Sequence, residues 1–544
     1  NSLLESLAYE TPMGLHPTTL KYTPGLANRW FVAPDKMTFF FKFDPRAKFS
    51  DGEAVEAYDY VATWDLYTDE GLDDPFQNDY WNKYERPVAL TRDIVMVKSK
   101  QLNWRTFLSA GTFVVLPQHV IGEMTGKEYL EKFQFSMMPG SGPYEYLDSK
   151  TNISLTMKRR SDWWGDKLPL NQGLYNFDNL IFECITDENL LKEKLKKGDL
   201  DFMQVNIARE WHQELTADKM EKIAKGWIQK RKIFTHKAAG TSGMAYNMRQ
   251  WPFDDINVRK AVAHLYNREL MMDKLFFNEY VYLDSFYANS PYENEDNPII
   301  RYDPDEAIDL LEEAGWAQTS INDEGYMVRD GKVFEITLPY VSKSGERIYT
   351  IFQEDLKEVG IKLKLKQITW ATMIKDLGDR NFSLLPMAYT GLIFPNPESS
   401  MHSKFADQKN NNNIWGFKNK RVDEICDKYS SMFDLEERIA AVKEIDGIAC
   451  REHLWCFGWY GPHTRILYWN KFGAPDYLFS RFERSTNSII VYWWLDAEKE
   501  KKMEEAIDAG AALTEDSKTF HKGLDVKYWD KYIKKHGAEE LGDL

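Results

Sequence analysis

One stretch of the chain, from Gly331 to Tyr389, constrains the fold more than any other. Its apolar residues recur with the spacing of a strand, a helix, a strand, a helix and a final strand. Two strands that are joined through a packed helix are most simply parallel, with a right-handed crossover. The stretch therefore predicts a β-α-β-α-β unit within an α/β fold. The expected elements are Val333–Tyr340, Gly345–Val359, Ile361–Ile368, Ala371–Asp379 and Phe382–Tyr389.

Within this unit, the first helix and the second strand each show one apolar face. In the helix, Ile348, Phe352 and Leu356 fall on one side, and Gly360 stands where a helix stops. In the run IKLKLKQI, apolar residues alternate with lysines, so we expect one face of that strand to be buried and the other to face solvent. Each of these elements therefore packs through a single face.

The end of the last strand predicts the position of a ligand site. Parallel sheets of this kind open crevices at the carboxyl ends of their strands. The third strand delivers Met387, Ala388, Tyr389, Thr390 and Gly391 to that edge. We therefore expect a ligand to bind there.

Two further segments carry clear sequence signals, one for a helix and one for a long loop. Asp303, Pro304 and Gly315 predict the start and the end of a helix, because they are a capping residue, a first-turn proline and a C-terminal glycine. The stretch from 391 to 417 is long, irregular and rich in Asn and Pro, and loops of this length within compact lobes are usually functional or mobile.

The length and charge of the chain exclude several classes of protein. A chain of 544 residues is too long for one core and is expected to divide into two or three lobes. With 69 Lys and Arg against 85 Asp and Glu, its formal charge of -16 repels nucleic acid and anionic membranes. Aromatic residues make up 14% of the chain, which fits either a large core or a ligand cleft.

Nothing in the sequence is long and apolar enough to predict a membrane span. The sequence opens at Asn1 without a basic and apolar leader, so any export signal is expected to have been removed or never to have been present. The four cysteines are too few for a disulfide scaffold. Cys450 and Cys456 either form a bridge or remain buried thiols in a helix and the following strand, and we favour the thiols.

Sequence motifs of catalysis and cofactor binding are absent. The chain contains no GxxxxGK[ST], GxGxxG after a strand, HExxH or GxSxG, and its histidines form no spaced pair on an expected helix. We therefore expect no enzyme, no cofactor and no metal. A carboxylate pair that meets only in the fold would leave no motif, so a hydrolase of peptides or glycans is the alternative. In the turn MMPGSGPYEY, Gly140, Gly142 and Pro143 mark either a close backbone approach to a ligand or a turn between domains.

Several segments together resemble family 5 of the extracellular solute-binding proteins, which serve peptide ABC importers. The segments occur in the family's order and extend over most of the chain. The stretches WWGDKLPLNQGLYNFD and YWNKFGAP are most similar to the Yej-type branch of oligopeptide-binding proteins. The other matching segments are FKFDPRAKFSDGEAVEAYDY, GSGPYEY, FDDINVRKAVAHLYNRE, YDPDEAIDLLEEAGW and EVGIKLKLKQITWATMIKDL.

The resemblance implies an α/β fold of the periplasmic binding protein type II kind, with two large lobes, a hinge and a small inserted α/β lobe. Crossings near Asn247 and Trp469 would be the hinges. The implied segments are 1–30, 139–246 and 474–544 for lobe I, 31–138 for the small lobe, and 247–473 for lobe II.

The resemblance also implies the ligand-binding residues. Peptide backbone would pair with an N-terminal segment and with the strand end described above, while side-chain pockets remain tolerant. Asn413 and Trp415 lie in a loop that matches one overhanging the cleft in the Yej branch. Tyr9, Tyr389, Trp415 and Trp459 are candidates for apolar and stacking contacts, with core packing as the alternative for each. The backbone contacts would come from Ala8, Tyr9 and Glu10 and from Ala388, Tyr389 and Thr390.

One departure from the family affects the choice of ligand. Many peptide binders carry an Asp just after the strand, which holds the terminal amine, whereas this chain reads Tyr389, Thr390, Gly391. The Yej branch also lacks this Asp, so the ligand is a modified or longer peptide, or not a peptide. The sequence also starts later than family members usually do, which predicts that an N-terminal strand is missing.

These features predict the substrate-binding component of an ABC importer, which captures an oligopeptide or peptide-like solute by hinge closure and delivers it to a membrane permease. We expect a monomer that is periplasmic or extracellular, is associated with the membrane through the transporter and lacks its signal peptide. The hydrolase is one rival, and a receptor or chaperone-like module on the same fold is another.

Overall fold

The computed structural model describes residues 2–134, 136–316, 321–483, 487–513 and 524–538. The chain forms two compact units. It passes from one unit to the other after Gln204, Met220, Thr235 and Arg465, so both units are discontinuous in sequence. Unit 1 contains Asn1–Gln204, Glu221–Thr235 and Ile466–Leu544, and unit 2 contains Val205–Met220 and His236–Arg465.

The unit boundaries after Thr235 and Arg465 lie shortly before the crossings near Asn247 and Trp469 that the sequence predicts. Asn247 lies fully buried inside unit 2, and Trp469 lies within unit 1. Residues 31–138 belong to unit 1 here. The division into three lobes and the hinge positions stay predictions, and parts of the expected tail, at 514–523 and 539–544, lie outside the described residues.

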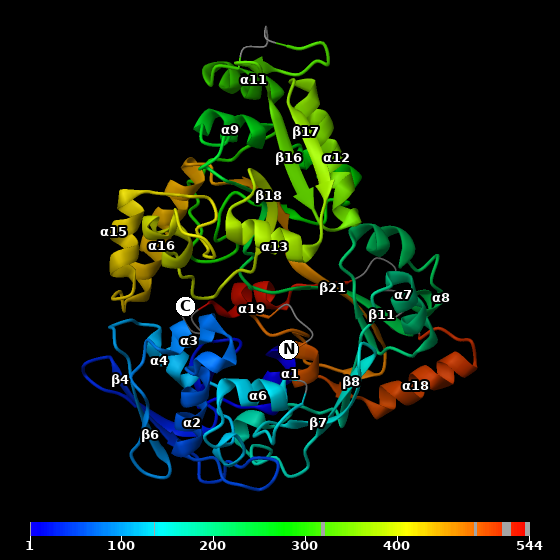
Figure 1. Ribbon diagram of the computed structural model, residues 1–544. Coiled ribbons are helices and arrows are strands. Elements are labelled where there is room, and N and C mark those ends of the chain that lie inside the picture. The colour runs from blue at the N-terminus through cyan, green and yellow to red at the C-terminus, as the bar shows by residue number, and fades with distance from the viewer. Residues whose placement is uncertain (1, 135, 317–320, 484–486, 514–523, 539–544) are drawn as a thin grey trace. The chain divides into compact units, whose positions relative to one another are not determined.

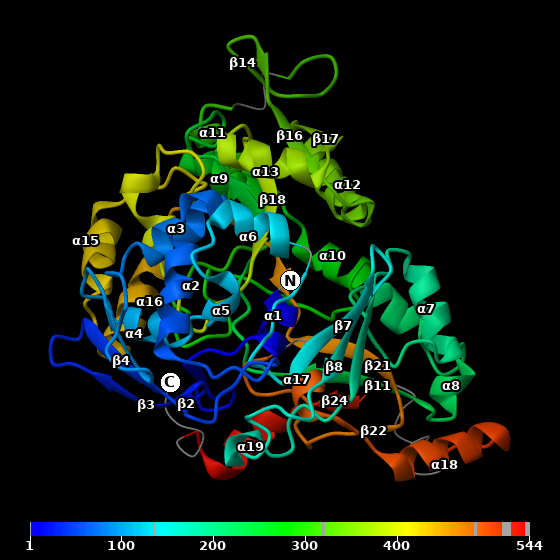
Figure 2. The ribbon, with the colours of Figure 1, turned by 60° about the horizontal axis from the view of Figure 1, so that its bottom comes forward.

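Unit 1 is built on three larger sheets, with strand orders β3-β4-β6-β5, β7-β8-β9 and β10-β21-β11-β24. Figure 2 shows β7 and β8 side by side, as their antiparallel pairing requires. The bounds are Ala27–Val32 (β3), Thr38–Phe43 (β4), Val88–Ala89 (β5), Ile94–Lys98 (β6), Tyr144–Lys150 (β7), Ser154–Arg159 (β8), Asn179–Glu183 (β9), Phe202–Gln204 (β10), Ile228–Phe234 (β11), His463–Trp469 (β21) and Leu524–Val526 (β24). The helices include Ser2–Ala8 (α1), Ala57–Tyr67 (α2), Glu188–Lys197 (α7), Ala497–Asp508 (α18) and Tyr528–His536 (α19).

The glycines of the MMPGSGPYEY turn are explained by contact with α1. A Cβ atom on Gly140 would lie 2.1 Å from the Ala8 carbonyl oxygen, and one on Gly142 would lie 2.4 Å from the Leu7 carbonyl oxygen. The Gly142 amide also donates to the Ala8 carbonyl at 2.8 Å. Two backbone segments of the protein therefore meet here, and the close approach requires residues without a side chain.

Unit 2 contains the β-α-β-α-β unit that the sequence predicts. β16 (Glu335–Tyr340) and β17 (Lys362–Gln367) are parallel, with Leu338 opposite Leu365. Figure 1 shows α12 (Lys343–Glu358) beside these strands, and its residues Phe352 and Leu356 are fully buried in the unit 2 core. α13 (Trp370–Asp379) and β18 (Leu384–Tyr389) complete the unit. The periodicity correctly predicted all five elements.

The position of β18 differs from the sequence prediction. β18 lies against β16 but forms its ladder with β12 (Thr241–Tyr246), which is antiparallel to it. Pro339 and Pro386 both lie within ladders that do form, opposite Lys366 in β17 and Met244 in β12. The antiparallel partner of β18 is thus a strand far away in the sequence, and periodicity does not predict that pairing.

The remaining helices of unit 2 surround this core. α11 (Pro304–Glu313) begins as expected, because the Asp303 carboxylate accepts from the Glu306 amide at 3.1 Å. Cys450 and Cys456 are free, buried thiols in α16 and β19, as favoured from the sequence. The bounds are Ile256–His264 (α9), Arg268–Lys274 (α10), Lys420–Tyr429 (α15), Leu435–Arg451 (α16), Trp455–Phe457 (β19) and Trp459–Tyr460 (β20).

Candidate functional site

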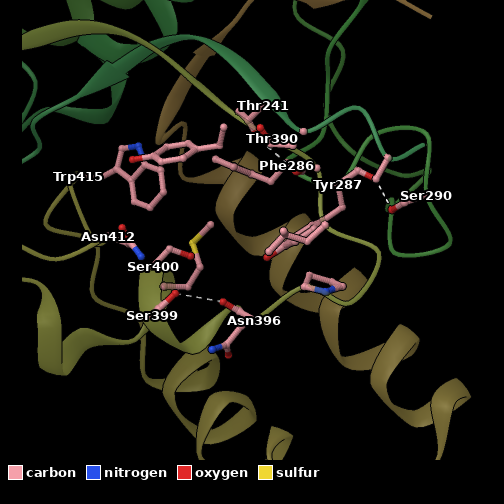
Figure 3. Close-up of a pocket in the computed structure, with 17 residues that line it drawn as sticks. Thr241, Phe286, Tyr287, Ser290, Thr390, Asn396, Ser399, Ser400, Asn412 and Trp415 are labelled. Carbon is pink, nitrogen blue, oxygen red and sulfur yellow. Dashed lines mark hydrogen bonds between the residues drawn. The ribbon is translucent and has the colours of Figure 1, made fainter. Parts of the chain in front are cut away.

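A pocket with a volume of about 230 Å³ opens in unit 2 at the carboxyl end of β18 (Figure 3). Three segments form it: the start of β12, the loop that follows β18, and a loop near residue 287. Its position matches the edge where the sequence predicts a ligand. The lining residues are Ala238, Gly240, Thr241, Phe286, Tyr287, Ser290, Tyr389, Thr390, Gly391, Leu392, Pro395, Asn396, Ser399, Ser400, Met401, Asn412 and Trp415.

Two glycines let the backbone segments meet at the base of the pocket. Gly240 has a φ of +76°, and a Cβ atom there would lie 2.0 Å from the Tyr389 carbonyl oxygen. A Cβ atom on Gly391 would lie 2.4 Å from the Ala238 carbonyl oxygen. Side chains at either place would push the two segments apart, so this part of the pocket depends on glycine.

The polar groups of the pocket are neutral. None of the lining residues that the structure describes is an Asp, Glu, Lys, Arg or His. Hydroxyl and amide groups supply its hydrogen-bonding capacity, and Figure 3 shows Asn396 and Ser399 on the lower side in that view. Such groups both donate and accept, so they suit a solute that is polar but uncharged. The polar members are Thr241, Ser290, Thr390, Asn396, Ser399, Ser400 and Asn412.

Aromatic rings form the rest of the wall. Phe286 meets Trp415 edge to face, with ring centroids 5.8 Å apart, and Trp415 meets Trp455 at 5.9 Å. Tyr389 packs on Trp455 at the same distance, 5.9 Å. Trp455 is buried, so it fixes the other rings from behind. The indole N–H of Trp415 is buried and has no hydrogen-bond partner among the described residues.

A buried carboxylate holds the loop that carries Phe286 and Tyr287. Asp446 of α16 accepts from the Ser285 hydroxyl at 2.7 Å and from the Phe286 amide at 2.9 Å. It also accepts from the Asn294 amide at 3.0 Å and the Asn297 side-chain amide at 2.8 Å. Burial raises the pKa of the Asp446 carboxyl, and these four donors act in the opposite direction. One side chain of α16 thus fixes both ends of the loop.

The sequence-predicted residues fall into three groups. Tyr389, Thr390 and Trp415 line the pocket together. Ala388 precedes them in β18 and is exposed, but it is not a lining residue. Trp459 lies elsewhere in unit 2, where it packs against Phe276 with ring centroids 4.5 Å apart. In that position its ring serves the core, the alternative that the sequence left open.

Asn413 is next to the pocket but points into its own loop. Its side chain is fully buried, and its oxygen accepts from the amides of Gly416 and Phe417 at 3.1 and 3.0 Å. Its nitrogen donates to the carbonyls of His402 and Phe417 at 3.2 and 2.9 Å. The amide is thus fully used in holding the loop that presents Trp415.

The N-terminal candidates Ala8, Tyr9 and Glu10 lie in unit 1. Ala8 and Tyr9 are buried, and the Tyr9 hydroxyl donates to the Met138 carbonyl at 3.2 Å and accepts from the Met138 amide at 2.9 Å. These contacts anchor the segment to the turn that contains Gly140 and Gly142. They give Ala8 and Tyr9 a structural role in unit 1.

Glu10 is the titratable member of that segment. Its side chain accepts from the Trp164 indole N–H at 2.7 Å, and its amide donates to the Ser141 hydroxyl oxygen at 3.0 Å. Burial raises the pKa of Glu10 to about 7, and the hydrogen bond from Trp164 together with the charge of Arg160 offsets part of that rise. The side chain therefore changes its charge close to neutral pH.

Sequence reasoning missed most of the wall. Phe286, Tyr287 and Ser290 belong to an irregular segment with no periodic signal, and Asp446 is one of many carboxylates on helices. Only the length and composition of the loop from 391 to 417 pointed to the polar side of the pocket. That stretch supplies Asn396 and Asn412 and, from the short helix Glu398–Met401 (α14), Ser399 and Ser400.

The described part of the chain has neither a cluster of metal ligands nor a helix suited to crossing a membrane. It contains no group of three or more His, Cys, Asp and Glu side chains arranged to hold a metal ion. Among the described residues, no helix combines the length and the apolar character needed to cross a membrane.

Comparison with known proteins identifies the family. The sequence matches the family described as Bacterial extracellular solute-binding proteins, family 5 Middle, over residues 21–412, which is more than half of the chain. The chain belongs to this family. The family resemblance noted in the sequence is thereby confirmed.

Relatives of this solute-binding protein extend over nearly its whole length. The uncharacterized protein YejA of Escherichia coli strain K12 is 24% identical over 528 residues, which cover 90% of this chain and 84% of YejA. The oligopeptide-binding protein AppA of Bacillus subtilis, solved with a nonapeptide, is 20% identical with a TM-score of 0.73, covering 91% of this chain and 94% of that one. NikA of Brucella suis, solved with Fe(III)-EDTA, is 19% identical with a TM-score of 0.71, covering 87% and 91%.

These likenesses show that the chain is a solute-binding protein with the α/β fold of type II periplasmic binding proteins. The two solved relatives hold very different ligands, a nonapeptide and a metal chelate. The fold therefore does not determine which solute is bound, and the specificity must come from the side chains of the site.

The carboxylate of Asp446 provides one test of the pocket wall. In Asp446→Asn, the new amide nitrogen would face donors, so we expect a loss of about 2 kcal/mol or more in the free energy of unfolding, measured with urea. Asp309→Asn is the matched control, because Asp309 is exposed on α11. Wild-type stability in Asp446→Asn would show that the carboxylate does not hold the loop.

The raised pKa of Glu10 predicts a pH dependence of stability. A carboxyl whose pKa rises from 4.5 to about 7 on folding stabilises the protein fully below pH 4.5, and that contribution is lost as the pH rises to 7. We expect Glu10→Gln to remove a decline of about 3 kcal/mol between these values, measured by urea unfolding at each pH. Glu123→Gln, at an exposed position, should keep the wild-type profile. Equal profiles for Glu10→Gln and wild type would contradict the shift.

Proposed function

We propose that this protein is the substrate-binding component of an ABC importer, and that it captures an oligopeptide or peptide-like solute and presents it to a membrane permease. The observation that carries the choice of solute is the neutral pocket at the end of β18, lined by aromatic, hydroxyl and amide groups. Binding, without bond breaking, is the whole reaction. Closure of the lobes about a hinge, which the sequence predicts, belongs to this proposal.

The volume of the pocket indicates that only part of the ligand enters it. A volume of about 230 Å³ is below the range of about 300–1,000 Å³ that encloses a drug-sized molecule. It suits one bulky side chain or ring, with the rest of the solute outside. An extended peptide that places one residue in the pocket meets this condition, and the AppA relative was solved with a nonapeptide.

The chemistry of the wall narrows the choice further. A terminal ammonium or carboxylate needs an opposite charge or several strong hydrogen bonds when it is buried. The described lining residues offer no opposite charge, which favours the entry of an uncharged group. An acceptor oxygen on that group would also satisfy the buried Trp415 indole N–H, which has no partner among the described residues.

The alternative hydrolase needs two carboxyl groups that face one scissile bond. The described lining of the pocket contains no carboxyl group, so the proposal assigns no catalytic residue and no cofactor. The remaining parts of the proposal follow from the family, whose description is extracellular. We propose a monomer in the periplasm or outside the cell, associated with the membrane through its permease.

Tyr389→Ala tests the pocket directly. Native mass spectrometry of gently purified protein should show a retained solute in the wild type, and its affinity should fall by about tenfold or more in Tyr389→Ala because an aromatic contact is lost. Trp370→Ala is the control, since Trp370 is 60% exposed on α13 and does not line the pocket. An unchanged affinity in Tyr389→Ala would place the solute elsewhere. Recovery of cleaved solute after incubation would favour the hydrolase.

A further inference from the structure

Four consecutive asparagines, at positions 410–413, lie in the stretch that forms the polar side of the unit 2 pocket. Asn411 and Asn413 turn their side chains into this stretch. The Asn411 side-chain nitrogen donates to two backbone carbonyls of the stretch at 3.0 and 2.9 Å, and Asn413 makes the contacts described above. Asn412 lies between them, is exposed and lines the pocket. Its side-chain amide has no hydrogen-bond partner within the part of the chain that the structure describes, so it is available to a ligand.

Two arginines fix the backbone on either side of Asn412. Arg380 donates to the Asn411 carbonyl at 2.8 Å. Arg249 donates to the Asn413 carbonyl at 2.9 Å. Neither arginine lines the pocket, so the two guanidinium groups position the Asn412 amide without placing a charge in the wall. An amide that is held in place before the ligand arrives loses less conformational entropy on binding.

Most hydroxyl groups of the pocket already donate their proton within the protein. The hydroxyls of Thr241 and Ser290 donate to backbone carbonyls of the loop near residue 287, at 3.1 and 2.5 Å (Figure 3). The hydroxyls of Ser399 and Ser400 each donate to a backbone carbonyl at 3.4 Å. A hydroxyl group has a single proton to donate. While these bonds are kept, four of the five Ser and Thr hydroxyls in the lining offer a ligand only their remaining lone pairs.

These two observations define what a ligand group must supply. It needs N–H donors for the hydroxyl oxygens and an acceptor oxygen for the Asn412 amide nitrogen. A primary carboxamide carries both, with two N–H donors and one carbonyl oxygen in a single plane. A carboxylate has nearly the same shape but no donor, so it would leave the hydroxyl oxygens facing further acceptors. A thioether or an alkyl group has no donor and at most a weak acceptor.

We propose that the group which this pocket binds is a primary carboxamide, either the side chain of an Asn or Gln residue or the amidated end of a peptide. The proposal rests on the proposed function, because it names the part of the peptide-like solute that enters the pocket. The Asn412 amide nitrogen donates to the carboxamide oxygen, and the carboxamide nitrogen donates to the hydroxyl oxygens. Figure 3 shows Asn412, Ser399 and Ser400 on one side of the pocket in that view. Asn412 thus determines specificity, whereas Asn413, which the sequence indicated, holds the loop.

Binding of alanine pentapeptides to the full chain tests the proposal. One series carries a single Gln at each position in turn, and matched series carry Glu or Met at the same position. A further pentapeptide has an amidated end, with the free acid as its control. Gln, Glu and Met have similar lengths, so the series differ mainly in hydrogen bonding and charge. After dialysis of the protein, calorimetry should show that a Gln peptide or the amidated peptide binds about tenfold or more tightly than its counterparts. The series that shows this preference identifies the source of the carboxamide.

A pair of matched variants tests the role of Asn412. Asn412→Asp keeps the shape of the side chain but replaces its N–H donor with an acceptor, so the preference for the carboxamide should fall by about tenfold or more. Asn410→Asp is the control, because Asn410 is exposed in the same stretch and does not line the pocket. It adds the same charge and should keep the wild-type preference. Both positions are exposed, so the midpoint of urea unfolding should not change in either variant.

The possible failures are distinguishable. Equal affinities for the Gln, Met and amidated peptides and their controls, or tighter binding of a Glu peptide, would overturn the carboxamide assignment and leave the proposed function intact. An equal loss of preference in Asn410→Asp and Asn412→Asp would show that added charge, and not the lost donor, is responsible, which would overturn the role of Asn412. Failure of every peptide to bind would contradict the proposed function together with this assignment.

Discussion

The carboxylate of Asp446 accepts hydrogen bonds from four groups of the loop between Ser285 and Asn297. A buried carboxylate is costly unless its oxygens are satisfied, so the fold of the loop from Ser285 to Asn297 is tied to this one side chain. The loop in turn presents Phe286 and Tyr287 to the pocket. The neutral wall of the pocket is therefore supported by an ionisable side chain that does not itself line the pocket.

Much of the fold could be predicted from sequence, because its elements have local causes. The β-α-β-α-β unit follows from periodicity, and α11 follows from Asp303 as its cap. The antiparallel partner of β18 could not be predicted in this way. β12 is more than a hundred residues away in sequence, so its pairing with β18 leaves no local signal.

The residues of the candidate site also divide into those that sequence signals predict and those that depend on contacts between distant segments. Tyr389 and Thr390 could be predicted from a strand end and from the family resemblance, Trp415 could be predicted from the resemblance alone, and all three line the pocket. Asn413 and Trp459 were also named under the resemblance, but burial and packing give them structural contacts. Phe286 and Asp446 left no sequence signal, since their roles depend on contacts between distant segments.

The central claim is that the unit 2 pocket takes an uncharged part of a solute. A crystal structure of the protein purified together with its solute tests this most directly. We expect solute density against Tyr389, Thr390 and Trp415, with hydrogen bonds only from neutral groups of the pocket. Density elsewhere with this pocket empty, or a charged group of the solute paired with an Asp, Glu, Lys or Arg side chain in the pocket, would contradict it.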